Sequence, residues 1–229
     1  KSIFTWSKSS GLTKSTQELR RIGGNKLTLS QSVTQLPDGT LFLGEYGRNT
    51  KKNEISVLKS TDEGFTWEVA TTLAGGLIRH IHTVAYNPFD RNVWLGTGDT
   101  SEQIFLGFIH DGVFNKVFKN KQDYRAVSFQ FLGNKVFWGS DSPDIETNHI
   151  YSFDLNKNVL TNYGAVNGPV YYSYLNKNEE MYFATAHETL GIGMHNDNVS
   201  IWKKTDDGLE EVFTVPRANN TKRHSLIRF

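Results

Sequence analysis

The amino-acid sequence predicts an all-β fold that is built from many short strands. Aromatic residues make up 13% of the 229 residues, and the chain holds 20 Gly but only 5 Pro. Helical periodicity is nearly absent, whereas short runs of Val, Ile, Phe, Tyr and Trp alternate with turn clusters such as Pro37-Asp38-Gly39. Aromatic and β-branched residues favour strands, and turn residues between two apolar runs are typical of β-hairpins.

An internal repeat indicates how these strands are grouped. The clearest strands of the repeat begin at Leu41, Val93, Val136 and Met181, which are 52, 43 and 45 residues apart. Four-stranded units that recur every ~40–50 residues are typical of β-propeller blades. The sequence therefore predicts a single β-propeller domain over residues 1–229.

Each repeat contains four predicted strands in the same order. The first strands are expected at 27–33, 81–87, 126–132 and 170–175. The second strands are expected at 41–44, 93–96, 136–139 and 181–184. The third strands are expected at 55–58, 103–108, 149–153 and 199–202. The outer strands are expected near 67–71, 116–119, 160–163 and 211–215, which completes four blades.

The two ends of the chain are expected to share a fifth blade. Residues 2–7 and 18–22 are interpreted as its third and fourth strands, and residues 225–229 as its first strand. A C-terminal strand that pairs beside the N-terminal ones would close the ring and remove a sheet edge. No second strand is predicted for this blade, so the alternative is an open fragment of a longer propeller.

Composition and charge exclude several classes of partner. The formal net charge is +1 and no long run of Lys and Arg occurs, which argues against a nucleic-acid partner. No apolar stretch approaches the ~20 residues of a membrane-spanning helix. The chain has no Cys, which excludes disulfides and thiol chemistry. We expect no nucleic acid, no membrane span and no cofactor, while the compartment and the oligomeric state stay open.

One predicted turn carries a specific motif, Ser-Thr-Asp-Glu-Gly-Phe-Thr-Trp at residues 60–67. It matches the Asp-box pattern Ser-x-Asp-x-Gly-x-Thr-Trp at every defined position, through Ser60, Asp62, Gly64, Thr66 and Trp67. We predict that Asp62 accepts backbone hydrogen bonds, that Gly64 adopts positive φ, and that Trp67 packs between sheets. Degenerate copies occur at 7–13 and 205–208, again between predicted third and outer strands.

These features resemble the Asp-box (BNR-repeat) propellers, the superfamily that includes the sialidases. The resemblance covers roughly residues 27–215. Within this class, the chain resembles sialidase-like proteins from bacteria and phages most. The supporting stretches are 44–46, 78–82, 94–99, 124–127 and 138–142. The resemblance implies a propeller in which the Asp box is structural and lies opposite the active face. The Arg-Ile-Pro segment of true sialidases is absent from the sequence, so no sialidase catalytic role is assigned to any residue.

Polar side chains gather where a propeller usually has its site. Residues just before first strands and just after second strands share one face, and are expected to line one channel mouth. The catalytic candidates there are Glu45, His82, Asp99 and Asp141. The substrate-binding candidates are Tyr46, Arg79, His80, Arg125, Tyr171, His187 and Arg223. Arginines can bind a carboxylate through paired hydrogen bonds, and His, Tyr or a carboxylate can transfer a proton.

These residue types predict a carbohydrate-active propeller that acts on an acidic glycan. Two carboxylates suit a glycoside hydrolase, whereas an arginine that neutralises a uronate beside a His or Tyr base suits a polysaccharide lyase. The alternative is a non-catalytic glycan-binding or protein-interaction propeller, in which Glu45 and Asp99 cap turns or pair with Arg79 and Arg125. His80 and His82 share a strand face, as metal ligands can, but no third ligand is evident and no metal site is predicted.

Overall fold

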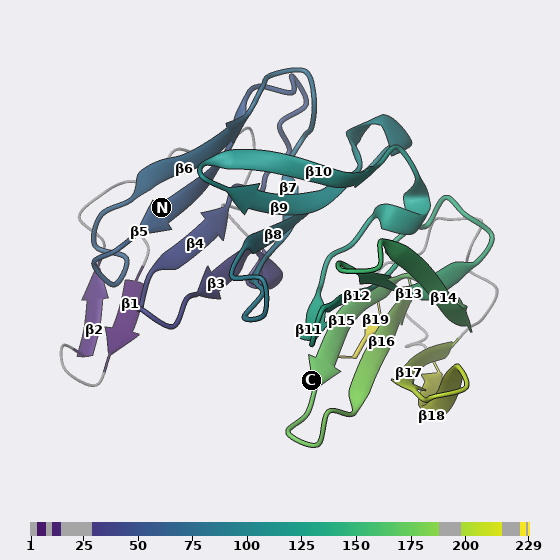
Figure 1. Cartoon of the computed structure of the whole chain (residues 1–229). Coiled ribbons are helices and arrows are strands. Elements are labelled where there is room, and N and C mark those ends of the chain that lie inside the picture. The colour runs from purple at the N-terminus through teal and green to yellow at the C-terminus, as the bar shows by residue number, and fades with distance from the viewer. Residues whose placement is uncertain (1–3, 8–10, 15–28, 188–197, 217–224, 228) are drawn as a thin grey trace. The chain divides into compact units, whose positions relative to one another are not determined.

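A computed structural model of the chain describes residues 4–7, 11–14, 29–187, 198–216, 225–227 and 229 (Figure 1). These residues form strands, turns and short 3-10 helices. The chain divides into two compact units, residues 1–87 with 91–119 and residues 88–90 with 120–229. In the described part of the chain, no helix has the length and apolar character needed to cross a membrane.

The first unit contains two four-stranded antiparallel sheets, in each of which every strand pairs with the next. The first sheet consists of β3 (Val33–Gln35), β4 (Leu41–Gly44), β5 (Ile55–Ser60) and β6 (Glu68–Leu73). The second sheet consists of β7 (Ile81–Tyr86), β8 (Val93–Thr97), β9 (Phe105–His110) and β10 (Val113–Lys119). The unit also contains a hairpin of β1 (Phe4–Ser7) and β2 (Gly11–Lys14), and the 3-10 turns η1 (Ser30–Ser32) and η2 (Ser101–Gln103).

The second unit repeats the same arrangement. One sheet consists of β11 (Gln130–Leu132), β12 (Lys135–Gly139), β13 (Asn148–Asp154) and β14 (Val159–Val166). The other consists of β15 (Val170–Leu175), β16 (Met181–His187), β17 (Asn198–Lys204) and β18 (Leu209–Pro216). The 3-10 turn η3 (Gln122–Tyr124) precedes the first of these sheets, and a short strand β19 (Ser225–Leu226) follows the second. The predicted all-β fold with four four-stranded repeats is confirmed.

Two predicted strands begin later than expected. Residues 29–32 lead into β3 through the turn η1, because the Ser32 hydroxyl donates to the backbone oxygen of His82 at 2.7 Å and holds this segment against β7. Likewise β11 begins only at Gln130, after residues 126–129 that were expected in the strand. The first difference arises from a contact with the neighbouring repeat, and in the second segment Ser128 Oγ accepts a hydrogen bond from the Ser173 hydroxyl of the next repeat at 3.0 Å.

The C-terminal strand β19 has a partner that the sequence did not indicate. It pairs with β16 through Ala186 and His187. A fifth blade shared by the C-terminal strand and the N-terminal strands stays a prediction. β16 continues past Ala184, its last residue paired with β17, and its free end offers backbone groups to β19. Residues 18–22 and Arg223 lie outside the described residues. The number of blades and the single domain over 1–229 stay predictions.

Small residues at the ends of second strands allow neighbouring sheets to approach. A Cβ atom added at Gly44 would lie 2.7 Å from a methyl carbon of Ile81, and one at Gly139 would lie 2.4 Å from Cβ of Val170. Both neighbours belong to the first strand of the following sheet and are fully buried. Glycine at these two places is therefore a packing requirement, because ordinary carbon contacts are ~3.5–4.0 Å.

In all four sheets, one residue in the last part of the second strand or directly after it supplies a side-chain oxygen to the third strand. Backbone N–H groups of the third strands donate to Glu45 Oε2, Thr97 Oγ1, Ser140 Oγ and Thr185 Oγ1, at distances of 2.8, 2.9, 3.0 and 2.9 Å. All four side chains are buried, so each bond satisfies a backbone donor that water cannot reach. The repeat thus extends from strand order to individual hydrogen bonds.

The Asp-box turn between β5 and β6 has the predicted geometry. Asp62 accepts hydrogen bonds from the backbone N–H of Thr66 at 2.8 Å and from the Ser60 hydroxyl at 2.8 Å. Gly64 adopts a φ of +86°, and the Trp67 indole N–H donates to its carbonyl at 3.0 Å. Trp67 is buried in a small cluster with neighbouring leucines. The motif therefore stabilises the turn through local hydrogen bonds and fixes the position of the Trp67 side chain.

Candidate functional site

The first unit brings together polar residues from three strand ends. Tyr46 follows β4, Arg79 and His80 precede β7, and His82 lies on β7. Asp99 follows β8, which pairs with β7. The backbone link between these segments is direct, since the N–H of Ile81 donates to the carbonyl of Glu45 at 3.0 Å. In this unit the start of β7 therefore lies beside the ends of β4 and β8.

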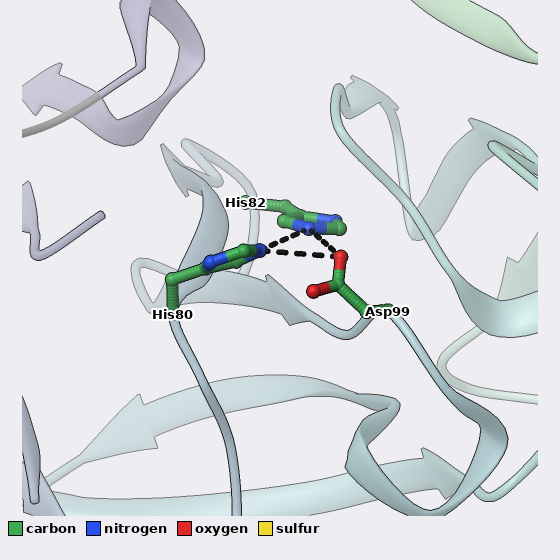
Figure 2. Close-up of side chains that lie close together, drawn as sticks. All are labelled: His80, His82 and Asp99. Carbon is green, nitrogen blue, oxygen red and sulfur yellow. Dashed lines mark hydrogen bonds and ion pairs between the residues drawn. The ribbon is translucent and has the colours of Figure 1, made fainter. Parts of the chain in front are cut away.

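Figure 2 shows the side chains of His80, His82 and Asp99 pointing toward one another. The Nε2 atoms of the two imidazoles are 3.0 Å apart. Asp99 Oδ1 lies 3.3 Å from Nε2 of His80 and 3.5 Å from Nε2 of His82. The two imidazoles are buried, while the Asp99 side chain keeps 23% of its exposure. These three residues, here named the His–His–Asp cluster, therefore reach solvent through the carboxylate.

Two neighbours hold the His–His–Asp cluster in place. The Arg79 guanidinium donates to Asp99 Oδ2 at 3.0 Å and to the Arg48 carbonyl at 3.2 Å. The ring of Tyr46 lies over that of His80, with centroids 4.2 Å apart. The Arg79 side chain is 34% exposed, so part of the guanidinium still faces solvent. The arrangement places a solvent-facing cation, two imidazoles and a phenol around one carboxylate.

The carboxylate of Asp99 is ionised in this setting. Burial alone would raise the pKa of Asp99, but hydrogen bonds and charge from His80 and His82 outweigh burial and hold this pKa well below its usual range. Arg79 adds a formal positive charge at the other carboxylate oxygen. The alternative in which Asp99 pairs with Arg79 is thus seen, although that pair uses only one of the two oxygens.

Glu45 has a structural task. Its Oε2 accepts the backbone N–H of Ser56, the same bond that Thr97, Ser140 and Thr185 make in the other sheets. The repeat therefore supports a structural role for Glu45, which binds a backbone N–H of β5.

The remaining described candidates belong to the second unit. Arg125 Nε lies 3.4 Å from Asp141 Oδ2, and both side chains are nearly buried. Tyr171 and Tyr172 are half-buried neighbours on β15, and His187 is buried at the end of β16. Their convergence with the His–His–Asp cluster on one channel mouth stays a prediction.

Sequence reasoning missed the relation of Asp99 to the two histidines. It noted that His80 and His82 share a strand face, and separately that Asp99 follows the second strand of the same sheet. The register of β7 and β8 joins the two observations, because Ile81 pairs with Thr97. The pairing register of the β7–β8 hairpin could have identified Asp99 as the third residue of the cluster.

Comparisons with known proteins bear on the fold. No protein-family model matches the sequence, and no curated protein matches it. Among solved structures, a protein from Lactobacillus plantarum is 13% identical with a TM-score of 0.60, over 99% of this chain and 68% of that one. A TolB-like protein from Agrobacterium tumefaciens is 12% identical with a TM-score of 0.57, over 94% of this chain and 74% of that one.

A third similar structure is an oligogalacturonate lyase in complex with manganese. It is 12% identical with a TM-score of 0.55, and the match covers 79% of this chain and 52% of that one. At such identities the likeness concerns the fold alone. Together with the four-stranded repeats, it defines a protein of the β-propeller class.

Proposed function

We propose that this chain is a carbohydrate-active propeller protein that binds an acidic glycan beside the His–His–Asp cluster. The observation that carries the proposal is the partly exposed Arg79 side chain, held by Asp99 next to buried imidazoles. A planar guanidinium suits a carboxylate because its N–H groups match the two oxygens. The Asp-box turn and its resemblance to sialidase-like propellers also support a carbohydrate ligand.

We propose polysaccharide lyase chemistry for this site. Removal of the proton beside a uronate carboxylate requires that the carboxylate be neutralised and that a base lie close to it. Arg79 supplies the positive charge, and His82 or Tyr46 is the base. The likeness to an oligogalacturonate lyase that was solved with manganese fits this choice, although it rests on the fold. The two carboxylates of a glycoside hydrolase are less well represented, because Glu45 caps a turn.

A non-catalytic glycan-binding protein is the second candidate. It is favoured by the ion pairs Arg79–Asp99 and Arg125–Asp141, which engage the arginines that a substrate would need. In this case the glycan binds at the exposed edge of Arg79 without any bond being broken.

A screen of uronate- and nonulosonate-containing polysaccharides tests the proposal. Lyase activity releases unsaturated ends that absorb in the ultraviolet, whereas hydrolysis releases reducing ends without that absorbance. Arg79→Ala is expected to abolish binding and turnover, and Arg91→Ala, which alters an exposed arginine on the loop between β7 and β8, serves as the matched control. Binding without turnover would establish the second candidate. No binding to any acidic polysaccharide would overturn both.

A further inference from the structure

The His–His–Asp cluster directs three possible metal-ligand atoms at one another. The Nδ1 atom of His80 lies 2.8 Å from the carbonyl oxygen of Gly47. A carbonyl only accepts hydrogen bonds, so Nδ1 of His80 carries a proton and Nε2 is the ring atom left to bind a metal ion. Nε2 of His80 faces Asp99 Oδ1 at 3.3 Å and His82 Nε2 at 3.0 Å.

Three side chains each offer one possible ligand atom to the same place. These atoms are Nε2 of His80, Nε2 of His82 and Oδ1 of Asp99, and they lie within 4.8 Å of one another. Arg79 does not occupy this place, since it binds the other oxygen of Asp99, Oδ2.

The separations of the three atoms are those of ligands around one metal ion. Zinc lies ~2.0–2.2 Å from nitrogen and oxygen ligands, so ligand atoms ~3.0–3.5 Å apart subtend angles between about 90° and 110° at the ion. The observed separations are 3.0, 3.3 and 3.5 Å. The ring of His80 is also oriented as metal ligands commonly are, with its other N–H bound to a backbone carbonyl.

We infer that His80, His82 and Asp99 bind one divalent first-row transition metal ion, of the class of Zn²⁺, Co²⁺ or Mn²⁺. Two imidazoles and one carboxylate suit these ions, whereas Ca²⁺ and Mg²⁺ prefer oxygen ligands throughout. Three protein ligands leave a coordination position open to water or to an oxygen of a bound molecule. This site goes beyond the proposed function, and glycan binding does not enter the inference.

Metal binding would also change the roles assigned above. Both imidazoles would lie on the ion through Nε2 and could not take up a proton there. Of the two bases named for lyase chemistry, Tyr46 would remain, with its ring tilted against that of His80. The ion would add positive charge beside Arg79, where a substrate carboxylate is proposed to bind.

Titration of chelator-treated full-length protein with CoCl₂ tests the inference, because Co²⁺ bound by nitrogen and oxygen has a visible absorption spectrum. We expect one Co²⁺ per chain, displacement by Zn²⁺ and weaker binding of Mn²⁺. His82→Ala and Asp99→Asn should each weaken Co²⁺ binding by more than the ~10–100-fold that second-shell changes cost. His110→Ala is the matched control, because this histidine is exposed at the end of β9 and lies outside the cluster.

Folding is checked separately by the denaturation midpoint of each variant without metal. Asp99→Asn keeps the shape of the side chain and guards against loss of fold in His82→Ala. The inference is overturned if wild-type protein binds no Co²⁺ or Zn²⁺, or if His82→Ala and Asp99→Asn bind Co²⁺ as tightly as His110→Ala. Metal binding without any glycan interaction would refute only the proposed function, and glycan turnover without metal binding would refute only this inference.

Discussion

Replacing Gly139 by alanine should destabilise the second unit through the contact between its two sheets. The added Cβ would lie 2.4 Å from Cβ of Val170 and 2.5 Å from both of its methyl carbons. These distances are about 1 Å short of an ordinary carbon contact. Rotation of Val170 does not remove the clash, because Cβ is fixed to the backbone. β15 must therefore move, which strains the bond from Val170 N–H to the Ser140 carbonyl at 2.9 Å.

Overpacking of a core costs ~1–3 kcal/mol, and the fixed Cβ places this substitution in the upper part of that range, at about 2–3 kcal/mol. For a chain of this size each kcal/mol lowers Tm by ~2–4 °C, so a loss of ~4–12 °C is expected. Urea denaturation followed by tryptophan fluorescence measures the free energy of unfolding. Gly44→Ala should cost less, because it meets methyl groups of Ile81 and Val84 at 2.7 and 2.8 Å.

Gly75→Ala is the matched control. Its added Cβ would meet other atoms at 3.5 Å or more, and a change of within ~0.5 kcal/mol is expected. The reasoning would be refuted if Gly139→Ala unfolded at the same urea concentration as wild type, or if the Gly75 control lost as much stability. Either result would mean that the sheets are not held at the separation seen between Gly139 and Val170.

Three further predictions follow from buried or titrating side chains. Asp62→Asn should lower stability at neutral pH, and the difference from wild type should vanish as pH falls below the usual aspartate range. Hydrogen bonds from Thr66 lower the pKa of Asp62, so its contribution is present above the unfolded pKa and lost in acid. Tyr151→Phe should lower the free energy of unfolding most below about pH 10. Above that pH, the difference in free energy of unfolding between wild type and the variant should shrink. Burial and the hydrogen bond to Asp123 raise the pKa of Tyr151, so an ultraviolet pH titration should show one tyrosine fewer ionising in the ordinary range. Thr185→Val should cost about 1–3 kcal/mol in urea denaturation, because it leaves the buried N–H of Ser200 without its acceptor, whereas Thr50→Val at an exposed position between β4 and β5 should be near neutral.

The strands were predicted well where the sequence reports a local cause. The second strand Leu41–Gly44 and the first strand Val170–Leu175 have the bounds that apolar runs between turn residues indicated. The Asp-box turn was predicted in detail, because its hydrogen bonds lie within seven residues of one another. Hydrogen bonds within such a short segment can be predicted from the sequence without any knowledge of neighbouring sheets.

The errors lie where a neighbouring repeat decides the structure. Residues 29–32 do not form a strand because Ser32 bonds to β7, about fifty residues away. The pairing of β19 with the end of β16 past Ala184 is a further feature that no hydrophobic pattern indicates. The catalytic role expected of Glu45 stays a prediction, although its Oε2 accepts a backbone N–H as the Ser140 hydroxyl does.

Asp99 shows why the candidate site could be predicted only in part. The repeat placed Asp99 near Arg79 and His80, and two exclusive interpretations followed, an ion pair or a chemical role. In the structure the two oxygens of Asp99 have different partners. Oδ2 binds Arg79, and Oδ1 is directed to the two imidazoles. The ion pair orients the carboxylate and so presents Oδ1 to the histidines. Pairing with Arg79 and the proposed metal binding through Oδ1 are therefore compatible, and loss of Arg79 should disturb the cluster even where the three proposed metal ligands are intact.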